Sequence, residues 1–365
     1  MFEKSGFYEH DDLWNENFLI TQGLSGYTFV AQKSTLIRGF MWQAASTSGS
    51  SIIDRMVFSI DNKFIETVPR ASLKFESNPT LGPSLSLVIP GKWWLLGPHF
   101  YKMSFQNVNG QEQWSLSVTV KCLPTKDLRF MVIPIQGTKR HFLPTQEWYD
   151  DIHRSMLRLG SLFPVRDGVI QDLDHSNPAG IRYQIGAAME AWPEEVGIHT
   201  IDYCGQTKQI NSRHGNVDVT ILYRPHQVGE DVGGISVIGG CPTRGCNCVS
   251  GKLGNGLGVT AACFAQETGH NFGLEPPGSP HFQDPQDHGH SKDAKIDNSD
   301  GYAYDFVNSR YYKDNLPHGG FLGDTLNNTG GGAFQGSDSI LFNSYDWEHL
   351  RQEIMKISDN YTGVF

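Results

Sequence analysis

The chain has 365 residues, a length that suggests two domains, because single hydrophobic cores rarely keep growing beyond about 250–300 residues. Its 40 glycines, 38% hydrophobic residues and only 19% charged residues are typical of a loop-rich globular protein that contains β-structure, and they exclude a disordered tail or a coiled coil. The net charge of −10 argues against nucleic acid as a partner, and no apolar run approaches the ~18–20 residues of a membrane span.

The first 125 residues are expected to form an all-β domain. Short segments rich in β-branched and aromatic residues alternate with turns at the ~8–12-residue spacing of a β-sandwich. Asp61-Asn62 and Asn109-Gly110 look like hairpin turns. The predicted strands are Tyr27–Ala31, Thr35–Trp42, Ile52–Ile60, Lys63–Val68, Ser84–Ile89, Phe100–Phe105 and Gln113–Val120. Strands of this number and length suit an immunoglobulin-like sandwich over residues 1–125.

Residues 126–365 combine predicted strands with predicted helices, which indicates an α/β or α+β domain. The clearest helix has apolar residues at helical spacing, namely Trp148, Ile152, Met156 and Leu159. The predicted helices are Thr145–Leu162, Ser176–Trp192, Gly258–Gly273 and Tyr345–Ser358, and the predicted strands are Arg129–Ile135, Val217–Tyr223 and Gly234–Gly239.

Three of the six cysteines, Cys241, Cys246 and Cys248, lie in one short segment with the spacing C-x4-C-x-C. Structural zinc sites normally use paired C-x2–4-C ligands or histidine partners, and this spacing matches that pattern poorly. Disulfides or plain thiols are therefore favoured, with a metal cluster as the alternative.

The segment with candidate chemistry begins with Gln266, Glu267 and His270, which occupy the positions of an H-E-x-x-H motif with glutamine in place of the first histidine. Residues four apart share one helix face, so Gln266 and His270 can coordinate the same metal ion. Glu267 lies beside them, where its carboxylate can act as a general base toward water. Gly273 follows where a helix must end and turn sharply, and His281 is the first histidine beyond that turn.

This segment resembles the metzincin signature H-E-x-x-H-x-x-G-x-x-H of zinc metallopeptidases. The third ligand of that signature falls on Pro276, which cannot bind metal, so the resemblance transfers the role to His281, with Glu275 as a weaker substitute. Residues 301–305 and 323–327 are similar to downstream segments of secreted microbial metzincins that are fused to an immunoglobulin-like domain. The likeness covers most of the chain, because N-terminal segments also resemble the sandwich domain of those relatives.

The resemblance implies a zinc-dependent endopeptidase that hydrolyses protein or glycoprotein substrates. It implies that His270, His281 and the amide oxygen of Gln266 hold Zn²⁺, and that Glu267 is the catalytic base. It also implies that the glycine-bounded strand at residues 233–240 is an edge strand that pairs with extended substrate, although the segment can equally be an ordinary sheet strand. A tyrosine is expected to assist the oxyanion, and the candidates are Tyr302, Tyr304, Tyr311 and Tyr312.

Two departures from the signature favour a second hypothesis. Gln266 offers only a neutral amide oxygen, whereas zinc prefers imidazole nitrogen, thiolate or carboxylate. Leu326 stands where the relatives carry the methionine of the Met-turn, although the two side chains have similar volumes. The alternative is a catalytically degenerate pseudopeptidase that serves as a protein- or glycan-binding module.

The relatives are exported proteins, which implies a secreted protein. The N-terminal residues contain Lys4 but no apolar segment of the kind that a secretory signal contains. The expectation is therefore export by a non-classical route, with the cytoplasm as the alternative.

Overall fold

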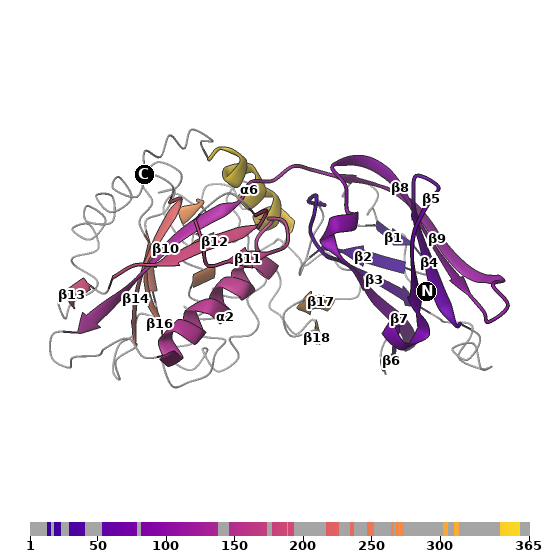
Figure 1. The fold of residues 1–365 in the computed structure, drawn as a ribbon, viewed down its shortest axis with the longest axis horizontal. Coiled ribbons are helices and arrows are strands. Elements are labelled where there is room, and N and C mark those ends of the chain that lie inside the picture. Colours follow the sequence, from indigo (N-terminus) through magenta and orange to yellow (C-terminus); the bar gives the residue numbers. More distant parts are fainter. Residues whose placement is uncertain are drawn as a thin grey trace. The chain divides into compact units, whose positions relative to one another are not determined.

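The chain divides into two compact units, Met1–Pro124 and Thr125–Phe365, close to the predicted division after residue 125 (Figure 1). The computed structural model describes residues 13–15, 18–22, 29–40, 53–78, 82–137, 146–173, 177–187, 189–192, 217–225, 234–236, 247–251, 264–265, 268–269, 271–273, 302–305, 310–313 and 344–357. Among these residues, no helix combines the length and the hydropathy needed to cross a membrane.

The first unit is a β-sandwich, as predicted, formed by two antiparallel sheets (Figure 1). One sheet has the strand order β1-β2-β3-β7-β6 and the other has the order β5-β4-β8-β9. The strands are β1 (Leu13–Asn15), β2 (Phe18–Thr21), β3 (Thr35–Phe40), β4 (Arg55–Ile60), β5 (Lys63–Pro69), β6 (Lys74–Asn78), β7 (Gly82–Ile89), β8 (Gly97–Gln106) and β9 (Glu112–Cys122).

The sandwich core follows from the alternation of side chains along the strands. In β4, Met56, Phe58 and Ile60 are buried while the residues between them are half-buried, as a period of two requires. Trp94 lies fully buried in the same cluster, with its ring centroid 4.5 Å from that of Tyr101 and 5.9 Å from that of Phe29. Aromatic rings at these separations contribute packing energy in addition to the area that they bury.

Most strands predicted for this unit are present, with ends shifted by a few residues, but the prediction for Tyr27–Ala31 is wrong over its described part. Val30 forms only an isolated bridge with Leu123, and the chain turns at Gln32, where φ is 62°. The side chain of buried Gln22 accepts from the N–H of Val30 and donates to its carbonyl, so the Val30 backbone is satisfied without a second neighbouring strand. Sequence patterns also missed the short strands β1, β2 and β6.

The two predicted hairpin turns are confirmed. Asp61 and Asn62 have φ values of 50° and 63° between β4 and β5, the backbone of a type I′ turn, and Gly110 has φ 76° between β8 and β9. The Asp61 carboxylate accepts from the Phe100 N–H at 2.9 Å and from His99 Nδ1 at 2.8 Å. The other ring nitrogen of His99 lies 3.1 Å from the Leu96 carbonyl oxygen, so both nitrogens face acceptors and the imidazolium form is favoured.

The Asp61–His99 pair predicts a pH-dependent contribution to stability. The hydrogen bond to Asp61 raises the pKa of His99 above 6.5, and the same bond lowers the pKa of Asp61 below 3.8. The histidine contribution is therefore complete below about pH 6.5 and is lost as pH rises through the folded-state pKa, whereas the aspartate contribution is lost as pH falls below about 4. We expect Asp61→Asn, which keeps the acceptor for Phe100, to be most destabilising between these limits. Urea unfolding at pH 5.5 and 8.5 measures this, and an equal effect at both values would contradict the assignment.

The second unit is built on one mixed sheet with the strand order β11-β12-β10-β14-β16-β15, to which β13 adds by pairing with the far end of β10 (Figure 1). All of these pairings are parallel except that of β15 with β16. The strands are β10 (Leu128–Gly137), β11 (Val169–Ile170), β12 (Ile181–Ile185), β13 (Met189–Trp192), β14 (Val219–Pro225), β15 (Gly234–Ser236) and β16 (Asn247–Gly251). The other elements are the helices α2 (Gln146–Leu162) and α6 (Ser344–Met355) and the hairpin of β17 (Tyr302–Asp305) with β18 (Arg310–Lys313).

The apolar patterns that predicted β10, α2 and α6 are those of buried elements. Consecutive residues 128–134 of β10 are buried, as expected of a parallel strand covered on both faces. The α2 residues at helical spacing, Trp148, Ile152, Met156 and Leu159, are all at most 3% exposed. These three predictions are confirmed, and so is the strand at residues 219–223.

The predicted helix Ser176–Trp192 is wrong, because the structure has β12 and β13 in this segment. The apolar and alanine-rich sequence suits a helix locally, but residues 181–185 pair in parallel with residues 128–132 of β10. Ile181, Arg182 and Tyr183 are consecutive and buried, which a helix with one solvent face does not explain. Tertiary pairing therefore overrides local helix preference here.

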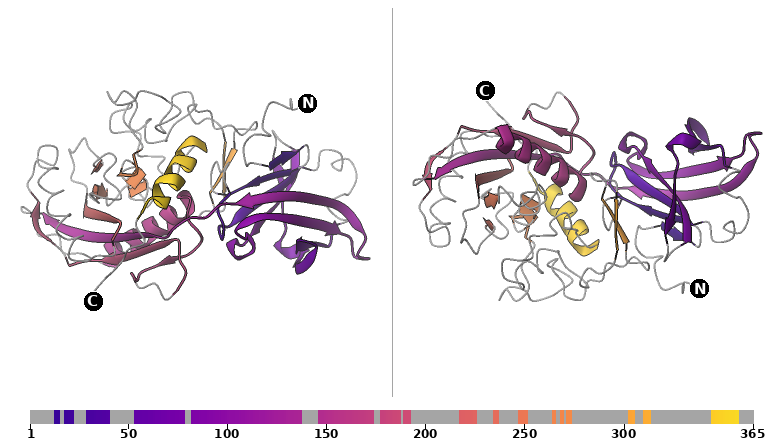
Figure 2. Two further views of the ribbon diagram at one scale, coloured as in Figure 1. Left: turned by 90° about the horizontal axis from the view of Figure 1, so that it is seen from above. Right: turned by 90° about the horizontal axis from the view of Figure 1, so that it is seen from below.

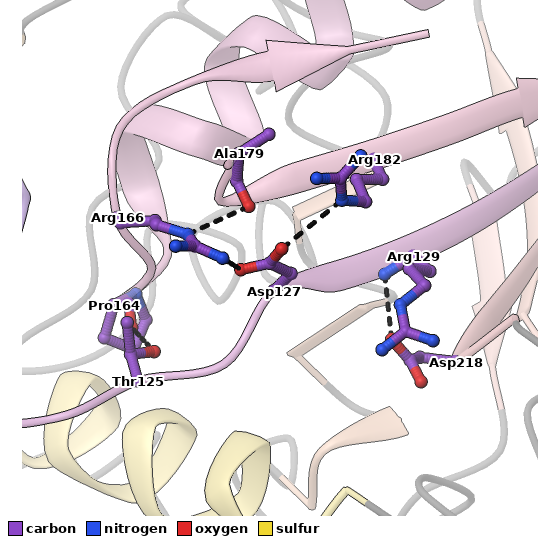
Figure 3. A network of polar contacts seen from close by, with 8 residues as sticks. All are labelled: Thr125, Asp127, Arg129, Pro164, Arg166, Ala179, Arg182 and Asp218. Atoms are coloured by element: carbon purple, nitrogen blue, oxygen red, sulfur yellow. Dashed lines mark hydrogen bonds and ion pairs between the residues drawn. The ribbon is translucent and has the colours of Figure 1, made fainter. Parts of the chain in front are cut away.

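A network of charges surrounds the start of the sheet (Figure 3). The carboxylate of Asp127 accepts from Arg166 and also from Arg182 Nε at 3.3 Å, and the Arg182 side chain is only 1% exposed. Nearby, Asp218 Oδ2 accepts from the Arg129 N–H at 2.9 Å, which fixes β14 beside β10. These groups lie at the amino ends of the parallel strands β10, β12 and β14, so we assign them a structural role.

Removal of the Asp127 carboxylate is expected to destabilise the second unit, because it leaves the Arg182 charge buried without this counter-ion. We expect Asp127→Ala to lower the free energy of unfolding by about 3–5 kcal/mol. Lys356→Ala is the matched control, because it breaks the solvent-exposed ion pair with Glu353 and should cost less than about 1 kcal/mol. Urea denaturation followed by tryptophan fluorescence compares the two, and equal losses would contradict the structural role.

Candidate functional site

The predicted site residues Gln266, Glu267, His270 and His281 lie outside the described residues, as do Glu275 and Leu326. The structure describes the residues that flank the first three, namely 264–265, 268–269 and 271–273, and residues 264–273 are here called the motif segment. Residues 264–265, 268–269 and 271 are helical, so the chain is helical before and after these candidate positions. The predicted helix Gly258–Gly273 is confirmed over these residues.

The described part of the motif segment is firmly anchored. Phe264, Ala265, Thr268 and Asn271 are 0% exposed and Phe272 is 1% exposed. The ring of Phe272 meets that of Phe163, just after α2, edge to face at a centroid distance of 6.5 Å. A segment with this much buried surface is held in one position by the core.

The helix ends where the sequence predicted. The N–H of Phe272 lies 3.2 Å from the carbonyl oxygen of Thr268 and 3.0 Å from that of Gly269, a shared bond that is common at helix ends. The next residue, Gly273, has φ 93°, a conformation that side chains other than hydrogen disfavour. The backbone therefore turns sharply immediately after the motif.

A hydrogen bond from the last helix, α6, holds this end of the motif segment. His349 of α6 lies with Nε2 2.8 Å from the carbonyl oxygen of Phe272 (Figure 2 shows α6 beside the short helical turn). Because a carbonyl only accepts, Nε2 carries the proton and donates it. The sequence patterns did not identify His349. In the sequence it is one of several polar residues of an amphipathic helix, and nothing local distinguishes it.

The glycine-bounded strand predicted at Gly234–Gly239 is confirmed over Gly234–Ser236, as β15. It lies at the edge of the sheet and runs antiparallel to β16, with Ile235 opposite Cys248. One side of this short strand therefore has no neighbouring strand among the described residues.

The four candidate tyrosines belong to one antiparallel hairpin. Its register sets Tyr304 opposite Tyr311, Tyr302 opposite Lys313 and Ala303 opposite Tyr312. The structure thus groups these tyrosines with one another, and the described contacts do not include one between them and the motif segment.

The other titratable groups of the described residues do not form a second metal site. Among the described residues, no group of three or more His, Cys, Asp or Glu side chains is placed to hold a metal ion. His153 Nδ1 lies 2.7 Å from the hydroxyl of Tyr183, whose pKa is raised by burial. Cys122 is buried and does not belong to a disulfide, and Cys248 lies in β16, whereas the remaining cysteines lie outside the described residues.

No known family model matches the chain, and no curated protein matches it. Among solved structures, the chain is similar to the fibronectin(III)-like modules of CbhA from Clostridium thermocellum. That match has 14% sequence identity and a TM-score of 0.20, and it covers 30% of this chain and 99% of the other.

The turn at Gly273 provides a direct test of how the motif segment ends. A Cβ at this position would lie 3.2 Å from His349 Nε2, and the positive φ would be strained in addition. We expect Gly273→Ala to lower the free energy of unfolding by more than the ~1–2 kcal/mol of the backbone strain alone. Gly97→Ala is the matched control, because Gly97 has φ 96° and no atom within 4 Å of its would-be Cβ. Equal losses in urea denaturation would show that the His349 contact adds nothing.

Proposed function

We propose that the second unit is a zinc-dependent endopeptidase of the metzincin kind, acting on protein or glycoprotein substrates. In this proposal Glu267 is the general base, and His270, His281 and the amide oxygen of Gln266 hold the metal. The proposal combines the sequence motif with the surroundings that the structure gives to the motif segment.

The burial pattern of the motif segment carries the proposal. A regular helix turns about 100° per residue, so the buried positions 264, 265, 268, 269, 271 and 272 fall within roughly 160° of its circumference. A helix continued through the segment is expected to place positions 266, 267 and 270 together in the remaining arc. In such a helix Gln266, Glu267 and His270 would share the side that the described core contacts leave available.

The edge strand β15 is a second supporting observation. An edge strand is what the metallopeptidase resemblance implies for the segment that pairs with extended substrate, and β15 lies at the edge of its sheet. The sharp turn at Gly273 is a third, because the resemblance uses a glycine at this place to lead the chain toward the third ligand.

The donor set fits zinc, because imidazole nitrogens are preferred ligands and an amide oxygen can complete the set with lower affinity. When bound, the metal supplies a Lewis acid that polarises a peptide carbonyl and lowers the pKa of water. Glu267 takes a proton from the attacking water while the oxygen of that water forms a bond to the scissile carbonyl carbon. The same carboxyl then gives that proton to the amide nitrogen as the C–N bond breaks. A tyrosine of the β17–β18 hairpin is proposed to donate to the developing oxyanion.

The first unit is proposed to be immunoglobulin-like and to position the enzyme or its substrate. Its strand order supports the immunoglobulin-like fold, because β2-β3-β7-β6 facing β5-β4-β8-β9 corresponds to strands A-B-E-D facing C′-C-F-G of an immunoglobulin sandwich.

The enzyme hypothesis predicts about one tightly held zinc per chain and cleavage of a general protein substrate such as casein. Glu267→Gln is expected to reduce cleavage by at least about 100-fold while the zinc content stays unchanged, because the base is not a ligand. Glu353→Gln, a carboxylate substitution on α6, is the control that should leave cleavage unchanged. Elemental analysis and a fluorescent casein assay measure both properties.

Gln266 supports a second candidate function, a pseudopeptidase that binds protein or glycan without cleaving it. Protein that is metal-free after exposure to zinc, together with a Gln266→His variant that gains both zinc and cleavage, would establish this alternative. Protein that binds zinc and cleaves casein with Gln266 in place would exclude it.

A further inference from the structure

The carbonyl of Phe272 lies at a helix end and needs a hydrogen-bond donor from outside the helix. In a continuing helix this oxygen would accept from the N–H of residue 276, and the carbonyl of Gly273 would accept from residue 277. Both positions are proline, which has no N–H. The Phe272 residue is only 1% exposed, so water is a poor substitute.

His349 supplies the missing donor from 77 residues further along the chain, with Nε2 2.8 Å from the Phe272 oxygen. Its helix is itself held firmly, because Trp347, Leu350 and Ile354 are at most 1% exposed. The end of α6 is fastened as well, since the Ile357 carbonyl accepts from Lys126 Nζ. The donor is therefore presented by a rigid element.

We propose that His349 is a positioning residue for the metal-binding helix, and this inference rests on the proposed function. Its Nε2–H fixes the Phe272 carbonyl immediately before the turn at Gly273, and this turn lies between His270 and His281 in the sequence. The bond thereby sets the spatial relation between two ligands that belong to different segments, and so sets the zinc affinity. His349 touches neither the metal nor the substrate.

The test uses the 365-residue chain with three single substitutions in α6. His349→Leu removes the donor and keeps a similar volume, whereas His349→Gln offers an amide N–H near the former Nε2. Gln352→Leu is the control, because Gln352 is exposed and bonds to Glu348 within α6. Zinc affinity is measured by competition with a chromophoric chelator, and backbone opening is measured by hydrogen exchange of the peptide over residues 268–275 in metal-free protein.

We expect His349→Leu to weaken zinc binding by about 10–100-fold, the range for partners that orient metal ligands, and His349→Gln to stay within about threefold of the unsubstituted protein. We also expect His349→Leu to raise the exchange rate of the peptide by about tenfold or more, with Gln352→Leu unchanged in both measurements.

Unchanged zinc affinity in His349→Leu, or no rescue by glutamine, would overturn the positioning role. Absence of zinc binding in the unsubstituted protein would instead refute the proposed function. In that case the exchange rates alone decide whether His349 holds the helix end, and an unchanged rate overturns that too.

Discussion

The second unit depends on the burial of β10 on both of its faces. This strand pairs in parallel with β12 on one side and with β14 on the other, and a parallel pair cannot be joined by a tight turn. The chain must leave the sheet and cross over each time, and α2 is the first such connection. The buried face of α2 is a consequence of this arrangement, because α2 connects β10 to the strands β11 and β12, with which the chain re-enters the sheet.

Local patterns were sufficient where the neighbours along the chain decide the structure. The β4–β5 hairpin was predicted because Asp61 and Asn62 tolerate positive φ, and α2 was predicted because its apolar residues recur at helical spacing. They failed at residues 181–192, where pairing with β10 decides the conformation against local helix preference. Short strands such as β11 were missed for a different reason, because a strand of two residues carries no periodicity.

The candidate site also combines features that the sequence predicts with features that it does not. The spacing of Gln266, Glu267 and His270 is visible in the sequence, and so is the glycine that ends their helix. The edge position of β15 and the bond from His349 to Phe272 depend on contacts between distant segments. No sequence pattern encodes such a contact, because the partner of a carbonyl is chosen by where the folded elements lie. The absence of N–H groups at Pro276 and Pro277 shows only that some distant donor is needed.

The bond between Lys126 and the carbonyl of Ile357 joins residues that are 231 positions apart. Closing so long a loop costs much chain entropy, and long-range contacts of this kind slow the folding of a domain. During synthesis the motif segment leaves the ribosome well before α6 does. The hydrogen bond from His349 to Phe272, which holds the end of the motif segment, therefore forms only after the C-terminal helix has been synthesised and has docked.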